Sequence, residues 1–255
     1  MSFNYLPNLS HLRIVYYASL VSLPRVPSWK ELRIDDLGNL EEWCDFIVGE
    51  AHFPFLEQLT IAEMRQWPNN LPVLTELTII DCRGLNELPP LLPSSLSVLD
   101  LCGVISERLL NSVSCLTSLS SLTINSIPSL ASMPQGMLQA LAQLQDLRIR
   151  SCDELVTLED EVLPSTLTNI WLYRCHNLKS PPRVLHALTT LHTLDIRCCT
   201  HLTSLPDQGL PSSLQSLMIF RNLVLKERCP KDIGEDWPKI SHIPHLELEA
   251  PWDQD

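Results

Sequence analysis

The amino-acid sequence predicts an α/β solenoid, with short parallel strands on its concave face and turns and short 3-10 or α-helices on its convex face. The first observation is a recurring pattern: an apolar residue, two variable residues, an apolar residue, one variable residue and an apolar residue. The second is the interval between copies, which ranges from 18 to 29 residues. The third is that almost all of the 20 prolines lie between copies, where turns are expected.

The pattern has ten complete copies and one degenerate copy, so about 10–11 repeats form a single domain over residues 1–255. The copies are Leu9-Leu12-Ile14, Trp29-Leu32-Ile34, Leu56-Leu59-Ile61, Leu74-Leu77-Ile79, Leu96-Leu99-Leu101, Leu119-Leu122-Ile124, Leu144-Leu147-Ile149, Leu167-Ile170-Leu172, Leu191-Leu194-Ile196, Leu214-Leu217-Ile219 and the degenerate Ile243-Leu246-Leu248. This period is the signature of leucine-rich repeats, and the predicted fold is a leucine-rich-repeat solenoid, or horseshoe. Each copy predicts one strand whose second and third apolar residues point inward while their neighbours point outward.

The segments between the predicted strands are of two kinds. Pro-Ser turns, which exclude long helices, are predicted at 92–96, 163–167 and 210–214. One or two helical turns are predicted at 106–116, 136–144 and 183–188.

Two segments depart from the period. Residues 41–50 form an acidic insertion that we expect to loop out of the convex or lateral face. Residues 226–255 contain a polar, tryptophan-bearing stretch that predicts a C-terminal cap, because the last coil would otherwise expose its core. The start of the sequence enters a repeat directly at Leu6-Pro7-Asn8-Leu9, and we expect the N-terminal end to be truncated from a longer protein.

The composition restricts the class of partner. The net charge is −12 at pH 7 with 19% charged residues, and an acidic surface disfavours nucleic acid or an anionic membrane as the main partner. No apolar run approaches the roughly 18 residues of a membrane span, and the first residues lack a secretory signal. We therefore expect a cytoplasmic or nuclear protein without a membrane partner.

The nine cysteines do not form the paired, closely spaced sets of a disulfide framework. Four of them, with one asparagine, occupy the same place eight residues after the first apolar residue of their repeat. This predicted structural ladder comprises Cys82, Cys152, Cys175, Cys199 and Asn222. We expect these side chains to point inward and to bond backbone groups freed by the turn after each strand. Interior thiols suit a reducing compartment, and the single glycosylation sequon, Asn8-Leu9-Ser10, lies in the first predicted strand.

Some cysteines lie close to histidines and raise the question of catalysis. Cys175 precedes His176, and Cys199 lies two residues before His201, but both thiols belong to the ladder and the histidines to the turns. A zinc site made from Cys152, Cys175 and Cys199 is disfavoured, because a row of ligands on neighbouring strands does not make a tetrahedron. We predict no catalytic, cofactor-binding or metal-binding residues.

The outward positions of the predicted strands change in character along the chain. They are small and chemically plain from Thr60 to Asn125, whereas repeats seven to ten carry aromatic, basic and other large side chains. The predicted partner-binding residues are Arg148, Arg150, Trp171, Tyr173, Arg174, Asp195, Arg197, Met218, Phe220 and Arg221. Trp, Tyr and Arg are enriched at binding hot spots, and a solvent-facing aromatic cluster marks an interaction site. The alternative is that the arginines stack over the rings within the sheet and satisfy both without a ligand.

Two further features carry a family resemblance. Residues 74–89 and 191–206 have the form Leu-x-x-Leu-x-Ile-x-x-Cys-x-x-Leu-x-x-Leu-Pro, and the sequence GEDWPKISHIPHLEL closes the repeats at 234–248. With the LPSSL linkers, they make the chain resemble the C-terminal leucine-rich-repeat region of plant coiled-coil-type nucleotide-binding leucine-rich-repeat (NLR) disease-resistance proteins. The resemblance implies recognition of a pathogen effector or a guarded host protein, and restraint of the NB-ARC nucleotide-binding switch of the same receptor. These 255 residues contain no glycine-rich phosphate loop of their own.

Two other interpretations stay open. One is the substrate-recognition repeat domain of a ubiquitin-ligase adaptor, although no F-box-like helical segment is present. The other is an extracellular receptor ectodomain, which the single sequon and the lack of a signal sequence disfavour. The sequence does not identify the ligand.

Overall fold

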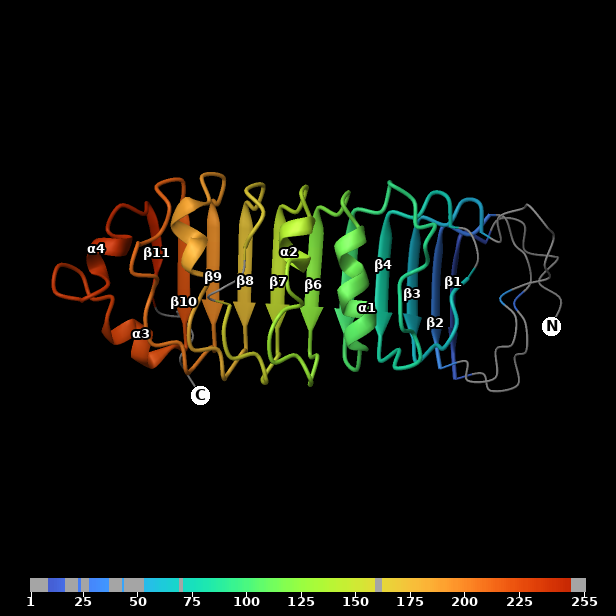
Figure 1. Ribbon diagram of the computed structural model, residues 1–255, viewed down its shortest axis with the longest axis horizontal. Coiled ribbons are helices and arrows are strands. Elements are labelled where there is room, and N and C mark those ends of the chain that lie inside the picture. The colour runs from blue at the N-terminus through green and yellow to red at the C-terminus, as the bar shows by residue number, and fades with distance from the viewer. Residues whose placement is uncertain are drawn as a thin grey trace. The chain divides into compact units, whose positions relative to one another are not determined.

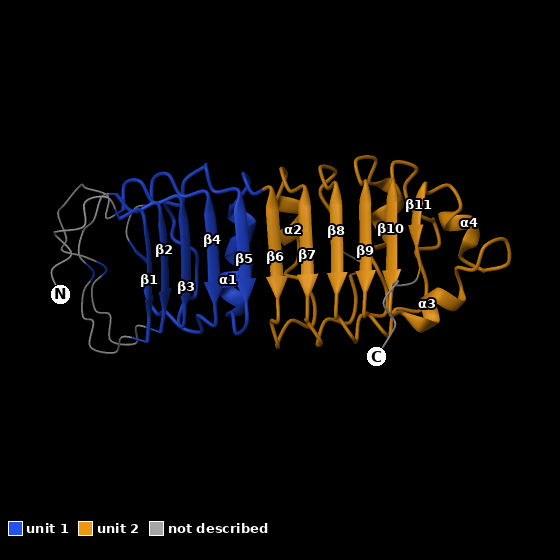
Figure 2. Cartoon of the chain, turned by 180° about the vertical axis from the view of Figure 1, so that it is seen from behind, with its two compact units in different colours: residues 1–119 blue, residues 120–255 orange. Residues whose placement is uncertain are grey.

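The computed structural model describes residues 9–16, 23, 28–36, 43, 53–68, 71–158 and 162–248. Contacts divide the chain into two compact units, residues 1–119 and 120–255 (Figure 2). Each unit is a stack of short parallel strands joined by turns and short helices (Figure 1). The predicted leucine-rich-repeat solenoid is confirmed.

The first unit contains five strands of five residues each. They are β1 His11–Val15, β2 Glu31–Asp35, β3 Gln58–Ala62, β4 Glu76–Ile80 and β5 Val98–Cys102. Each strand pairs in parallel with the next in the same register, so that Leu32 of β2 lies beside Leu59 of β3. After β5 come the helix α1, Glu107–Ser112, and the 3-10 helix η1, Val113–Cys115.

The second unit continues the same repeat. Its strands are β6 Ser121–Asn125, β7 Asp146–Arg150, β8 Asn169–Tyr173, β9 Thr193–Arg197, β10 Ser216–Phe220 and β11 His245–Glu247. Its helices are α2 Met137–Ala140, η2 Arg183–Ala187, α3 Leu223–Glu227 and α4 Trp237–Ile240. The strands from β6 to β11 are again paired in parallel, in the order in which they occur along the chain.

The apolar pattern accounts for the strands. In β4, Leu77 and Ile79 are buried, whereas Glu76, Thr78 and Ile80 between and beside them are not. Because side chains alternate across a strand and the register is constant, the inward leucines and isoleucines of successive strands stack into a core within each unit. The sequence period therefore fixes both the strand and the face that it buries.

A residue with left-handed backbone follows each strand from β1 to β10. These residues are Tyr16, Asp36, Glu63, Asp81, Gly103, Ser126, Ser151, Arg174, Cys198 and Arg221. Within the units, the N–H of such a residue donates to the carbonyl of the last residue of the next strand, as Arg174 does to Arg197 at 2.9 Å. L-residues seldom adopt this backbone, and the repeated hydrogen bond compensates for its cost.

The predicted helical turns are confirmed as α1 with η1, as α2 and as η2. Ser106 caps α1, since its Oγ accepts from the backbone N–H of Leu109 at 3.1 Å. The Pro-Ser segments at 92–96, 163–167 and 210–214 are turns, as predicted. Helices α3 and α4 lie in and beside the C-terminal segment, for which the sequence predicted a cap without specifying helices.

An aromatic cluster fills part of the first unit. Trp29 stacks on Phe53 with ring centroids 5.8 Å apart, and Trp43 meets Phe53 edge-on at 6.3 Å. Trp43 is buried, and its Nε1 donates to the carbonyl of Gln66 at 3.2 Å. The expectation that the whole insertion at 41–50 loops outward is thus wrong for Trp43, whose ring contributes to the core.

Several sequence predictions concern residues that the structure does not describe. The other residues of the acidic insertion, the N-terminal residues 6–8 with the sequon asparagine, and residues 249–255 lie outside the described residues. Within the described ranges, no helix is long and apolar enough to cross a membrane.

Candidate partner-binding surface

The ten predicted partner-binding residues lie on β7 to β10 and directly after them, in two rows across the strands. Arg148, Trp171, Asp195 and Met218 form one row, and Arg150, Tyr173, Arg197 and Phe220 form the other. Arg174 and Arg221 follow β8 and β10 in the left-handed turn position. We call these ten residues the arginine–aromatic face. The constant register brings them together, because each row takes its residues from one place in successive repeats.

Arginines stack on the aromatic rings of this face. The guanidinium carbon of Arg148 lies 4.2 Å from the ring centroid of Trp171. Tyr173 has two such neighbours, Arg150 at 5.6 Å and Arg174 at 5.3 Å. These are the cation–π contacts that the alternative interpretation of the surface requires. The cation–π contacts hold the flat faces of the arginines on the rings. The N–H groups at the edges of the guanidinium groups remain able to donate hydrogen bonds.

One arginine on this face has an internal carboxylate. Arg197 donates to both carboxylate oxygens of Asp195 through Nε at 2.7 and 2.9 Å and through Nη2 at 2.7 Å. The hydrogen bonds that it donates to Asp195 raise the pKa of the Arg197 guanidinium above its usual value. The same guanidinium lies 4.8 Å from the ring centroid of Phe220. Arg197 is therefore held between a carboxylate and a ring.

Two residues that the sequence places in solvent are covered. Phe220 is only 8% exposed and Asp195 only 5% exposed, so the expectation that both face solvent is wrong. The physical reason is Arg197, which reaches over the ring of Phe220 and forms the bidentate pair with Asp195. Trp171, Tyr173 and Met218 are half-buried, and Arg150 is exposed.

The face encloses a hollow of about 390 Å³. Its lining is Arg148, Arg150, Trp171, Leu172, Tyr173, Asp195 and Arg197. Three guanidinium groups and two large rings around one space provide both charge and apolar area for a protruding side chain.

The ladder residues lie beneath the turns. Cys82, Cys152, Cys175, Cys199 and Asn222 are all buried. Each cysteine Sγ lies 3.3–4.0 Å from two backbone carbonyl oxygens. Asn222 makes stronger bonds: Nδ2 donates to the carbonyls of Ile196 and Phe220 at 2.9 and 2.7 Å, and Oδ1 accepts from the N–H of Cys199 at 2.7 Å.

Burial makes two of these thiols unreactive. Burial raises the pKa of the Cys82 thiol to about 11 and that of Cys152 to about 12, so both stay protonated near neutral pH. His176 and His201 are exposed in the turns, where Nδ1 of His201 lies against the carbonyl of His176. In the described part of the chain, no three histidine, cysteine or acidic side chains are grouped so as to hold a metal ion.

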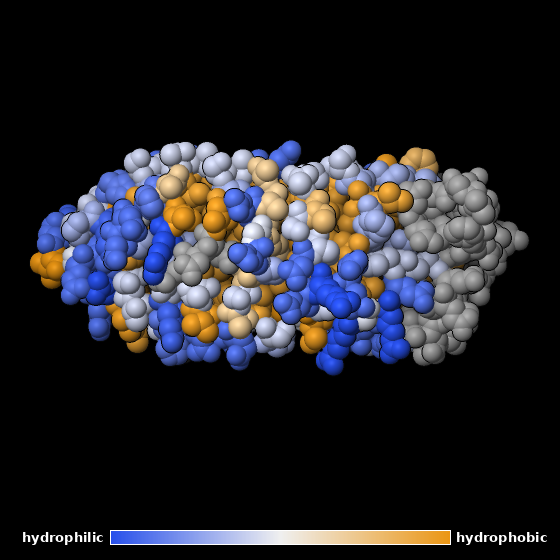
Figure 3. Space-filling view, viewed as in Figure 1, coloured by the Kyte–Doolittle hydropathy of each residue, from blue (hydrophilic) through white to orange (hydrophobic). Residues whose placement is uncertain are grey.

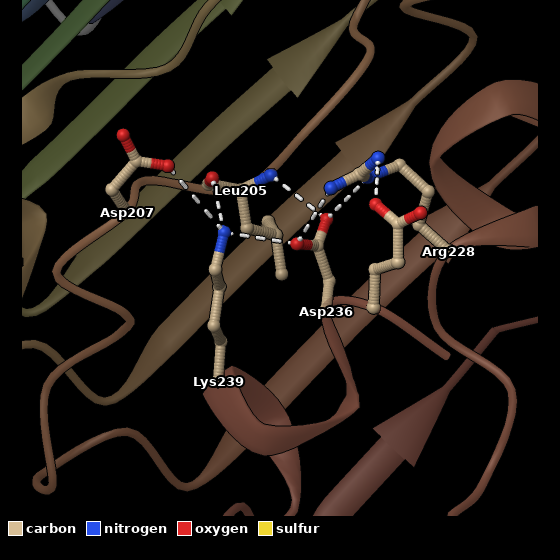
Figure 4. A network of polar contacts seen from close by, with 6 residues as sticks. Leu205, Asp207, Arg228, Asp236 and Lys239 are labelled. Atoms are coloured by element: carbon tan, nitrogen blue, oxygen red, sulfur yellow. Dashed lines mark hydrogen bonds and ion pairs between the residues drawn. The ribbon is translucent and has the colours of Figure 1, made fainter. Parts of the chain in front are cut away.

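The sequence missed one polar network, at the C-terminal cap (Figure 4). The Asp236 side chain is fully buried and accepts from Nε of Arg228 at 3.1 Å, from the N–H of Leu205 at 3.3 Å and from Nζ of Lys239 at 2.9 Å. Burial disfavours the charged carboxylate, but the bonds from Arg228 and Lys239 outweigh it and hold the pKa of Asp236 below its usual range. Hydrophilic residues predominate on the outer surface around α3 and α4 (Figure 3), as a terminal cap requires. The only sequence signal is the polar composition of this segment.

Comparisons with known proteins support the fold. Neither a protein-family model nor a curated protein matches the sequence. Among solved structures, the leucine-rich repeat domain of the type III effector XopL matches with a TM-score of 0.59 and 29% identity, over 80% of this chain and 74% of that one. The chain is a leucine-rich-repeat region, and this fold typically serves protein recognition and not catalysis.

Two more distant structures also match. An internalin, InlF, from Listeria monocytogenes has a TM-score of 0.47 and 15% identity, over 96% of this chain and 83% of that one. The Toll protein in the Toll–Spatzle complex of Drosophila has a TM-score of 0.48 and 17% identity, over 89% of this chain and 34% of that one.

Proposed function

We propose that this chain is the protein-recognition region of an intracellular plant immune receptor. It senses a pathogen effector or a guarded host protein through the arginine–aromatic face. The same region restrains the NB-ARC nucleotide-binding domain of the receptor until recognition, and the receptor acts in the cytoplasm or nucleus. The resemblance of the repeats and the closing sequence at 234–248 to plant NLR proteins supports this assignment.

The observation that carries the binding role is the hollow on β7 to β9. Trp171 and Tyr173 are half-buried beside guanidinium groups, so each ring keeps apolar area that a partner side chain is able to cover. Arginines already held on the rings lose less conformational entropy on binding than free arginines do. The surface therefore combines the residue types and the preorganisation of a binding hot spot.

Trp171→Ala tests this role. Removal of the ring should weaken partner binding by about 1–4 kcal/mol, as loss of a central interface anchor does. The free energy of unfolding should change by only about 0.5–1 kcal/mol, because the ring lies on the outward side of β8 and not in the core. The measurement is a cell-death assay in the receptor that contains this chain, paired with thermal melts of the purified variant.

Thr78→Ala is the matched control, since Thr78 occupies the same outward position on β4. It should leave both recognition and stability unchanged. Full activity of the Trp171→Ala receptor would place the binding surface elsewhere. A large loss of stability would instead mean that the Trp171 ring belongs to the core.

A further inference from the structure

The last outward residues of β7 to β10 form a repeated pair. Arg150 of β7 lies over the ring of Tyr173 of β8, and Arg197 of β9 lies over the ring of Phe220 of β10. Both arginines end their strands and both rings end the strands that follow. The same arginine–ring unit thus occurs twice, two strands apart, on the same side of the second unit.

The two copies differ in one component. Two residues before Arg197 stands Asp195, whose carboxylate takes three hydrogen bonds from the guanidinium. Two residues before Arg150 stands Arg148, which instead lies over Trp171 and donates to Ser121 Oγ at 3.1 Å. Within the described residues, Arg150 makes no ion pair. The first copy therefore lacks the carboxylate that the second copy supplies from its own strand.

A second cation stands beside the incomplete copy. Arg174 is exposed, and its guanidinium carbon lies 5.3 Å from the Tyr173 ring centroid. Like Arg150, it forms no ion pair with any other described residue. Two guanidinium groups thus lie within 6 Å of the centroid of one ring, and this concentration of positive charge favours an anion beside the ring.

The charge of this face is opposite to that of the whole chain. Strands β6 to β10 and the residue after each carry five arginines and two aspartates. The arginines are Arg148, Arg150, Arg174, Arg197 and Arg221, and the aspartates are Asp146 and Asp195. The chain as a whole has a net charge of −12, so this local excess of positive charge favours an acidic partner surface.

We propose that a carboxylate side chain of the bound protein completes the first copy, taking the place at Arg150 that Asp195 takes at Arg197. Arg174 provides the second donor, and the recognised segment is acidic. Bidentate pairing suits this geometry, because a guanidinium that stacks on a ring through its flat face still donates through its edge. This inference rests on the proposed function, since it names the chemistry of the partner at the same face.

The test uses the full 255-residue chain and a phage-displayed library of random dodecapeptides as the probe. Selected peptides should be enriched in Asp or Glu, and the best peptide should bind more weakly as NaCl is raised. Arg150→Gln and Arg174→Gln should each lower its affinity about tenfold, the worth of a charged hydrogen bond. Arg13→Gln is the matched control, because Arg13 is an exposed outward arginine on β1 and should leave the affinity unchanged.

A charge-insertion pair gives an independent readout. Arg148→Asp would place an internal carboxylate two residues before Arg150, as Asp195 stands before Arg197. It should abolish binding of the acidic peptide, whereas Arg148→Asn removes the same cation without inserting the competing group and should bind more tightly than Arg148→Asp. Equal affinities of these two variants would overturn the inference.

Other results separate this inference from the proposed function. If the selected peptides lack acidic residues and lose binding in Trp171→Ala but keep it in both glutamine variants, the face binds protein without the carboxylate contact. That result overturns the inference and leaves the proposed function intact. If a phosphoserine in place of the acid binds more than about tenfold tighter, the site is a phosphate site and the inference is also overturned. If the library yields no binder, the inference is overturned, and the cell-death assay of the Trp171→Ala receptor still decides the proposed function.

Discussion

The outward faces of β3 to β5 and of β7 to β9 have the same backbone and different chemistry. Both sets are five-residue strands in the same register, and both bury a leucine or isoleucine at the second and fourth positions. Outward, the first set shows Thr60, Thr78 and Asp100, whereas the second shows Arg148, Trp171 and Asp195. The inward residues of the strands therefore fix the fold, while the outward residues vary without changing it.

The two regions also differ in buried polarity. Among the described residues, the buried polar or charged side chains outside the cysteines are Ser121, Asp195, Asn222 and Asp236. All four lie in the second unit. Each must be satisfied internally, since an unpaired buried polar group is costly. The second unit therefore depends on specific polar partners, while the core of the first, in its described part, is apolar apart from the Cys82 thiol.

The largest expected effect is a loss of stability when a buried ladder cysteine is replaced by aspartate. It tests whether the ladder position is equally buried in both units. Cys82→Asp in the first unit and Cys175→Asp in the second should each lower the free energy of unfolding by about 3–4 kcal/mol. In both places the side chain faces two backbone carbonyl oxygens, and a carboxylate cannot donate to them. Guanidinium titrations at neutral pH measure the loss.

Asparagine is the control at both positions. Its amide donates to two carbonyls at once, as Nδ2 of Asn222 does, so Cys82→Asn and Cys175→Asn should be close to neutral. Similar midpoints for the aspartate and asparagine variants at either position would contradict an interior role for that thiol. A large loss at one position only would break the equivalence of the two regions.

The next effect concerns the polar network that only the second unit shows. Asp236→Ala should lower the free energy of unfolding by about 3 kcal/mol, because it removes the common acceptor of Arg228 and Lys239 and leaves the N–H of Leu205 without its partner. Asp207→Ala is the control. Asp207 also approaches Lys239, at 3.9 Å, but it is 99% exposed and should change stability by less than about 0.5 kcal/mol.

The same network predicts a dependence on pH. The folded-state pKa of Asp236 is lowered relative to an unfolded value of about 3.9, so its contribution is present above that pH and is lost as the pH falls through the folded pKa. The difference between wild type and Asp236→Ala should therefore shrink as the pH is lowered below about 4. A difference that stays constant down to acid unfolding would mean that the carboxylate charge does not stabilise the cap.

The strands and most helices were predictable from the sequence because they depend on local periodicity. Leu77 and Ile79 are inward by alternation alone, and Ser106 marks the start of α1. What the sequence missed depends on contacts between distant residues. Asp236 meets the backbone of Leu205, 31 residues away, and no local pattern pairs them.

The candidate site shows the same division. Alternation placed its residues in the two rows, but it did not reveal which of them are covered by a neighbouring strand. Phe220 has the outward position of the half-buried Ile80 and Tyr173, yet it is buried under Arg197 of the preceding strand. Trp43 likewise enters the core from an acidic insertion, because Phe53 receives its ring.

The smallest of these effects concerns the last outward residue of a strand, Phe220 on β10 and Ile80 on β4. Phe220→Ala should lower the free energy of unfolding by about 2 kcal/mol, less than for a ring in the apolar core, because the polar guanidinium of Arg197 lies over the Phe220 ring. Ile80→Ala on β4, at the same strand position but half-exposed, should cost only about 1 kcal/mol. Urea titrations of both variants measure the difference. If the two losses are equal, Arg197 adds nothing to the packing of Phe220, and the outward faces of the two regions differ only in their chemistry. If Phe220→Ala costs more, the covered ring stabilises the second unit as well as shaping its surface.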